Sequence, residues 1–290
     1  MTTPANADHA VLTLSCPDTP GIVYAVSEFL VSQQCTIVQS QQFGDPISGM
    51  FFMRVEFAHT DGAALDLPAM RSRITDIAGQ FAMAWRLVDA AERTRVVIMV
   101  SKFAHCLNDL LFRSSLGELN LDVVAVVSNH PDLGRLADSF GVPFRHIPVT
   151  ADTKDQAEAA LLELVREEQV DLVVLARYMQ ILSNDLCKQL DGRAINIHHS
   201  MLPSFKGARP YHQAHARGVK VIGATAHYVT ADLDEGPIIE QELLRVDHSL
   251  SPDQLAARGR EAESRALARA VRFHTENRII LDGSKTVVFQ

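Results

Sequence analysis

The chain has 290 residues, 47% of them hydrophobic and 21% charged, a composition that excludes a largely disordered or fibrous protein. Its 27 basic and 35 acidic residues give a net charge of −8, which argues against a surface that neutralises nucleic-acid phosphates. The four cysteines lie far apart, and no apolar run reaches the ~18 residues that a membrane span needs. We therefore expect a cytoplasmic protein with a small-molecule partner and with neither a nucleic-acid nor a membrane partner.

Residues 9–88 are predicted to form a small α/β domain. Their strand and helix patterns follow the order βαββαβ, which is typical of a ferredoxin-like sandwich. Alternating large apolar residues along 50–57 are expected to share one buried face: Phe51, Met53, Val55 and Phe57. The predicted strands are 10–14, 37–43, 50–57 and 81–87, and the predicted helices are 22–31 and 67–79. A short charged linker at 90–95 follows.

Residues 94–290 are predicted to form a second domain with a doubly wound, mostly parallel sheet, because strand and helix patterns alternate along them. The almost entirely apolar run 172–175 is typical of a strand buried on both faces. The predicted strands are 96–100, 123–128, 144–147, 172–175, 194–197, 222–229 and 237–244. The predicted helices are 104–112, 133–140, 155–168, 211–216 and 252–274, and the tail is expected to form a hairpin around Asp282-Gly283.

Polar residues that close apolar strands indicate where the chemistry lies, because ligands of open α/β sheets bind beyond the carboxyl ends of the strands. Asn196 and His198 are two residues apart on a strand and therefore share a face. An acidic turn, 232–235, follows the strand that carries His227, and its carboxylates are candidates for a general base or an orienting group. Residue type alone leaves a purely structural role open for both segments.

Two other kinds of site are less well supported. A zinc site is suggested by five histidines: His198, His199, His212, His215 and His227. Two of them, 212 and 215, have helical i, i+3 spacing. No His-Glu-x-x-His pattern or cysteine partner accompanies them. A dinucleotide site is excluded because the turn after the first strand of the second domain, 101–105, contains no glycine. We therefore expect metal-free chemistry.

Three separated motifs give the chain a resemblance to folate-dependent formyltransferases. They are Asn-Ile-His at 196–198, Ser-x-Leu-Pro-x-Phe-x-Gly at 200–207 and Leu-Asp-x-Gly-Pro at 233–237. Three further segments narrow the resemblance: Ala-His-Cys-Leu-x-Asp-Leu-Leu at 104–111, Gly-Ala-Arg-Pro-Tyr-His-Gln-Ala at 207–214 and Gly-Ala-Thr-Ala-His-Tyr-Val at 223–229. With them, the chain most resembles the formyltetrahydrofolate deformylase family over nearly all of residues 9–290. The N-terminal segment Cys-Pro-Asp-x-x-Gly at 16–21 resembles an ACT domain, which implies an amino-acid effector and a homo-oligomer.

The resemblance implies roles for individual residues. The catalytic residues would be Asn196, His198 and Asp234. The folate-binding residues would be Met179, Gln180, Ile181, Leu182, His199, Gly207, Arg209 and His227. No metal or other cofactor is implied, since the folate is itself the substrate.

One departure favours hydrolysis over formyl transfer. The similar glycinamide ribonucleotide formyltransferases hold their acceptor's phosphate with a loop rich in Gly, Ser and Asn, whereas the corresponding segment here, 101–106, is bulky and free of glycine. The resemblance therefore implies a hydrolase that converts 10-formyltetrahydrofolate to tetrahydrofolate and formate, with the formate serving purine synthesis. Two alternatives stay open, namely a formyltransferase with a non-phosphorylated acceptor and a catalytically silent folate or amino-acid sensor.

Overall fold

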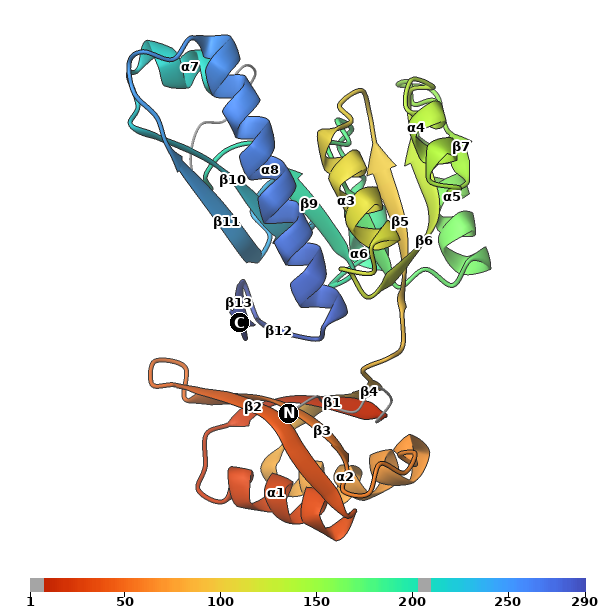
Figure 1. The fold of residues 1–290 in the computed structure, drawn as a ribbon, viewed down its shortest axis with the longest axis vertical. Coiled ribbons are helices and arrows are strands. Elements are labelled where there is room, and N and C mark those ends of the chain that lie inside the picture. The colour runs from red at the N-terminus through yellow and green to blue at the C-terminus, as the bar shows by residue number, and fades with distance from the viewer. Residues whose placement is uncertain (1–7, 203–209) are drawn as a thin grey trace. The chain divides into compact units, whose positions relative to one another are not determined.

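The computed structural model describes residues 8–202 and 210–290 (Figure 1). Its contacts divide the chain into two compact units. The first unit contains the residues up to Glu92 together with 276–280 and 287–290, and the second contains 93–275 together with 281–286. Among the described residues, no helix combines the length and the apolar character needed to cross a bilayer.

The first unit is built around a four-stranded antiparallel sheet in the order β2-β3-β1-β4. Its elements have the predicted βαββαβ order: β1 (His9–Pro17), α1 (Ile22–Ser32), β2 (Cys35–Asp45), β3 (Met50–His59), α2 (Leu67–Phe81) and β4 (Ala84–Asp89). The core contains the four residues predicted from the alternation in β3, which confirms that face: Phe51, Met53, Val55 and Phe57.

The end of α2 differs from the prediction of a strand beginning at residue 81. The helix continues through Phe81, and Ala82 then ends it in the left-handed conformation, with φ of 51°. The Ala82 N–H donates to the carbonyl of Ala78, so the backbone turns before it can extend. Strand β4 therefore begins only at Ala84.

The C-terminal tail also differs from the predicted boundary, because parts of 94–290 group with the first unit. The buried Arg54 of β3 explains this, since its Nε donates to the carbonyl of Asn277 at 3.2 Å and its Nη2 to that of Glu276 at 3.1 Å. Gln41 Nε2 donates to the carbonyl of Gln290 at 2.7 Å. The predicted hairpin around Gly283 forms between β12 (Ile279–Asp282) and β13 (Lys285–Val288).

The second unit contains a seven-stranded sheet in the order β11-β10-β9-β8-β5-β6-β7. Neighbours from β9 to β7 are parallel, whereas β10 is antiparallel to both β9 and β11, so the sheet is mostly parallel, as predicted. The strands are β5 (Thr94–Val100), β6 (Leu121–Ser128), β7 (Phe144–His146), β8 (Leu172–Leu175), β9 (Ala194–His198), β10 (Val221–Tyr228) and β11 (Ile238–Arg245). All four residues of β8 are buried, which confirms its central position.

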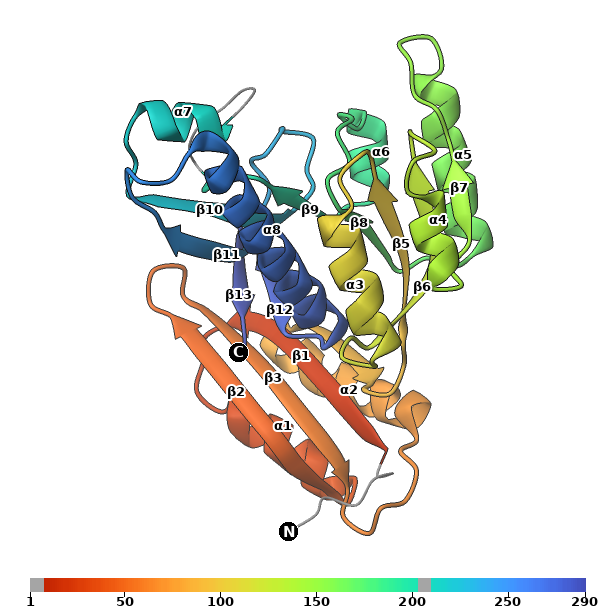
Figure 2. The ribbon, with the colours of Figure 1, turned by 45° about the horizontal axis from the view of Figure 1, so that its top comes forward.

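The helices of the second unit include one that the sequence patterns did not predict, α6. They are α3 (His105–Ser115), α4 (Gly134–Ser139), α5 (Lys154–Glu167), α6 (Asn184–Gln189), α7 (Pro210–Ala216) and α8 (Pro252–Thr275). Helix α8 packs along α3 and over β9, β10 and β11 (Figure 2). Strands β6 and β8 lie on opposite sides of β5, so the connections change direction between β5 and β8, which is where open α/β sheets leave a crevice for ligands.

Candidate active site

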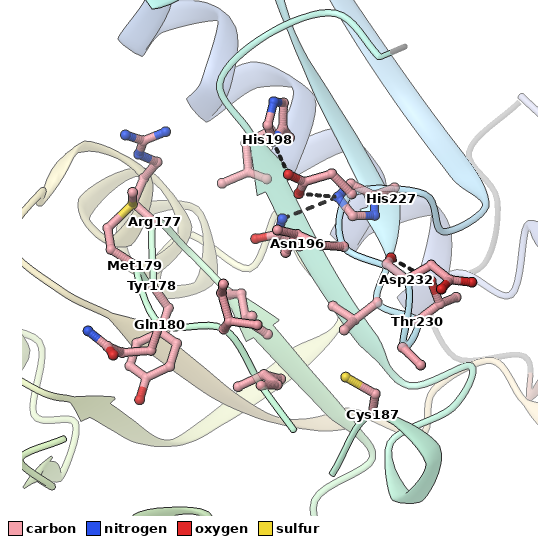
Figure 3. A pocket seen from close by; sticks show the side chains of 18 of the residues that line it. Arg177, Tyr178, Met179, Gln180, Cys187, Asn196, His198, His227, Thr230 and Asp232 are labelled. Carbon is pink, nitrogen blue, oxygen red and sulfur yellow. Dashed lines mark hydrogen bonds and ion pairs between the residues drawn. The ribbon is translucent and has the colours of Figure 1, made fainter. Parts of the chain in front are cut away.

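A pocket in the second unit gathers most of the predicted site residues (Figure 3). The volume of this cavity is about 190 Å³. Its lining includes nine predicted residues: Met179, Gln180, Ile181, Leu182, Asn196, His198, His199, His227 and Asp234. Two others, Gly207 and Arg209, lie outside the described residues.

Strand pairing brings Asn196 and His227 together, since they are opposite each other in the antiparallel pair β9–β10. His227 Nδ1 lies 2.8 Å from the carbonyl oxygen of Tyr228, which only accepts, so Nδ1 carries the hydrogen. Nε2 then accepts from Asn196 Nδ2 at 3.2 Å, a shorter contact than the 3.7 Å to Asp234 Oδ1. One hydrogen of the Asn196 amide is thereby fixed, and the other is left for a ligand.

His198 is held through one ring nitrogen and leaves the other for a ligand. Its Nδ1 lies 3.2 Å from Asp234 Oδ2, whereas its buried Nε2 has no hydrogen-bond partner among the described residues. The hydrogen bond from His198 holds the pKa of Asp234 well below its usual range, against the opposing effect of burial. Asp234 is therefore a carboxylate at neutral pH, and it orients the imidazole of His198.

The backbone of the acidic turn places Asp234 in a conformation that few residues with side chains adopt. Its φ is +57°, in the left-handed region, where aspartate is among the better tolerated residues. Gly236 follows, and a Cβ at that position would lie 1.8 Å from the carbonyl oxygen of Tyr228. The turn can approach β10 this closely only because residue 236 has no side chain.

His199 supports His198 from one side. The two rings stack, with centroids 4.9 Å apart and planes inclined by 26°. Burial, followed by the positive charges of Arg177 and His198, lowers the pKa of His199 to about 4. A neutral ring therefore lies against His198 at physiological pH.

The predicted folate segment, 179–182, begins shortly after β8. Met179 N donates to Ser101 Oγ at 3.0 Å, which fixes the start of the segment to the residue that follows β5. Met179 and Ile181 are exposed although they are apolar, with 54% and 61% of their surfaces accessible. Exposed apolar side chains at a pocket are typical of a binding surface for a ring.

Sequence reasoning missed a buried ionic network beside the pocket, centred on Glu263 of α8. Tyr211 OH donates to Glu263 Oε1 at 2.7 Å, while His105 Nε2 at 2.8 Å and Arg177 Nε at 3.3 Å meet Oε2. Burial raises the pKa of Glu263, but the hydrogen bond from His105 and the charge of Arg177 outweigh it and leave the pKa below its usual range. Glu263 is thus a buried carboxylate with its charge balanced by neighbours.

A signal for this network does exist in the sequence. Glu263 interrupts the buried stripe of α8, whose members recur at helical spacing: Leu255, Gly259, Ala262, Ala266, Leu267, Ala270 and Val271. A carboxylate inside such a stripe must have partners in the fold. Among the described residues, His105, Cys106 and Glu263 are the group placed closely enough for a metal, but Arg177 and Tyr211 already engage the carboxylate.

Comparison with known proteins finds relatives that match nearly the whole chain. Residues 94–271 match the formyl transferase family. The chain is 55% identical over 280 residues to the formyltetrahydrofolate deformylase of a Corynebacterium species, covering 97% of this chain and 98% of the relative. The crystal structure of the Burkholderia mallei formyltetrahydrofolate deformylase has a TM-score of 0.93 at 55% identity and covers 98% of this chain and 100% of its own. Glycinamide ribonucleotide transformylase 1 from Symbiobacterium toebii is more distant, with a TM-score of 0.66 at 31% identity over 71% of this chain and 98% of its own. The chain therefore belongs to the formyltetrahydrofolate deformylase family.

Proposed function

We propose that the chain hydrolyses 10-formyltetrahydrofolate to tetrahydrofolate and formate, with Asn196, His198 and Asp234 as the reacting groups. The observation that carries this proposal is the buried Nε2 of His198, which lacks a partner among the described residues while Nδ1 faces Asp234. A buried polar atom without a partner costs free energy unless a ligand supplies the hydrogen bond. A formyl oxygen has the right chemistry for that place.

The first proposed step is attack of water on the formyl carbon. The carbonyl oxygen becomes an oxyanion, which accepts hydrogen bonds from the free N–H of Asn196 and from Nε2–H of protonated His198. The carboxylate of Asp234, 3.2 Å from Nδ1, balances the charge of His198 and orients the water. These contacts strengthen as charge develops, so they lower the barrier rather than merely binding substrate.

The second proposed step breaks the bond between the formyl carbon and N10. The proton lost by the attacking water passes by way of Asp234 to N10, which leaves as the neutral amine of tetrahydrofolate. Formic acid remains and ionises to formate. Since residues of this chain supply every proton acceptor and donor in the scheme, we infer that no metal or cofactor is required.

The test is to incubate the purified protein with 10-formyltetrahydrofolate, a chelator and no acceptor, and to measure formate and tetrahydrofolate together. Equal release of both products is expected, and Asn196→Ala or Asp234→Asn should lower the rate about a hundredfold to a thousandfold while folate binding persists. Asp185→Asn, an exposed residue of α6, is the matched control and should retain the native rate. Near-native turnover of Asp234→Asn would remove Asp234 from the mechanism.

We further propose that residues 9–88 act as an ACT-like regulatory or oligomerisation module, with an amino-acid effector and a homo-oligomeric assembly, and that the enzyme supplies formate to purine synthesis in the cytoplasm. The βαββαβ order and the edge position of β2 support a module that pairs with another surface. Light scattering and titration with single amino acids test this module. A monomer whose turnover no amino acid changes would contradict it.

A further inference from the structure

The crevice between the carboxyl ends of β5 and β8 is the place where this fold ordinarily receives a ligand. Two segments reach it, 101–105 after β5 and 176–177 after β8. The first carries the large side chains of Phe103 and His105 and the second that of Arg177, and these side chains belong to a single packed arrangement. The crevice is therefore occupied by the chain itself.

Arg177 is the side chain that fills the crevice. Its Cζ lies 5.3 Å from the centroid of the Phe103 ring, and its Nε forms the 3.3 Å ion pair with Glu263. Only 11% of the Arg177 side chain is exposed. His105 and Tyr211 hold the same carboxylate, so Glu263 cannot turn away from Arg177 without losing two further hydrogen bonds.

Arg177 also belongs to the wall of the active-site pocket, where it lines the same cavity as His198 and His199 (Figure 3). Glu263, His105 and Tyr211 do not line that cavity. Arg177 is therefore the residue that joins the lining of the pocket to the network around Glu263, and that network holds its side chain in place.

We propose that Arg177, held on Phe103 by Glu263, is a specificity-determining residue that keeps amine acceptors out and reserves the formyl carbon for water. This inference rests on the proposed hydrolysis. In transfer to an amine, a bond forms between the amine nitrogen and the formyl carbon, the bond to N10 breaks, and N10 gains the proton that the amine loses. That reaction needs room beside the formyl group for an amine together with its substituent. In this proposal the Arg177 side chain occupies that room and leaves space only for water.

The test removes the Arg177 side chain from the pocket lining and measures whether water or an amine takes the formyl group. Arg177 has φ of +67°, a conformation that glycine adopts readily, so Arg177→Gly removes the side chain without straining the backbone. Native and variant proteins are given 10-formyltetrahydrofolate with methoxyamine, an amine that is unprotonated at neutral pH, and formate and formylated amine are quantified. We expect formate almost exclusively from the native protein and a rise of at least about tenfold in the transferred share from the variant.

Two further variants keep the result interpretable. Phe103→Ala removes the ring under the guanidinium at a position that is 47% exposed, where folding is tolerant, and should raise the transferred share by a smaller factor. Gln169→Gly places glycine at another left-handed position, exposed and after α5, and should leave the share unchanged. A transferred share unchanged in both Arg177→Gly and Phe103→Ala overturns this inference alone. Absence of formate from the native protein instead overturns the proposed hydrolysis.

Discussion

The Gly236→Ala variant should damage the active site although residue 236 contacts no substrate in the proposed mechanism. The added Cβ would lie 1.8 Å from the Tyr228 oxygen, 2.9 Å from the Tyr228 carbonyl carbon and 3.3 Å from His227 Nδ1. Because non-bonded carbon and oxygen atoms pack near 3.4 Å, the carbonyl and the turn must separate by about 1.5 Å. That carbonyl accepts the hydrogen bond that fixes His227, so the displacement reaches Asn196.

A displacement of about 1 Å in a catalytic group typically costs about a hundredfold in rate, and overpacking costs about 1–3 kcal/mol of stability. We therefore expect kcat/KM for 10-formyltetrahydrofolate to fall about a hundredfold and the urea midpoint to fall as well. Gly79→Ala is the matched control, since a Cβ there meets no atom within 4 Å and α2 should gain slightly in stability. A Gly236→Ala protein with kcat/KM within about threefold of native would refute the geometric reasoning.

Three other predictions concern the side chains around the pocket. Because the folded-state pKa of Asp234 is depressed, its ionisation stabilises the fold above the unfolded pKa of about 3.9 and this contribution is lost as pH falls further. The stability difference between native protein and Asp234→Asn, measured by urea unfolding at several pH values, should accordingly shrink as pH falls below about 4; a difference that does not shrink there would contradict this. His227→Phe keeps an aromatic ring but removes the acceptor for Asn196, so kcat should fall about tenfold or more with little change in KM, and a pure KM effect would count against the assigned hydrogen bond. Tyr211→Phe removes a 2.7 Å bond to the buried Glu263 and should lower the free energy of unfolding by about 1.5–3 kcal/mol, whereas an unchanged midpoint would show that the carboxylate is satisfied without it.

The elements that sequence patterns predicted best are those whose local signal and tertiary environment agree. The strand at 172–175 was predicted with its observed bounds because a short apolar run has one stable place, the centre of a parallel sheet. Helix α6 was missed although Ser183 caps it by accepting from Leu186 N. The conformation of Ala82, which ends α2, depends on the backbone and has no strong residue signature.

The candidate site also combines features that the sequence predicted with features that it could not. Asn196 and His198 could be paired from the two-residue period of a strand, and motif order added Asp234, which the structure places in the same pocket. The orientation of the Asn196 amide could not be predicted, because it depends on cross-strand pairing with His227. The stripe of α8 marks Glu263 as a residue that needs partners, but local patterns could not identify them, because His105 is 158 positions away in the chain.

The hydrogen bonds from Arg54 to the backbone of residues 276–277 determine when the first unit can complete its contacts during synthesis. The hydrogen bond from Arg54 to Asn277 spans 223 positions, and that from Gln41 to Gln290 spans 249. When the first 92 residues have left the ribosome, the guanidinium of Arg54 still lacks two of its carbonyl acceptors, so two hydrogen bonds of the folded first unit cannot yet form. The first unit should therefore be less stable while the second unit is being made, and residues 276–280 and 287–290 add their contacts to it only afterwards.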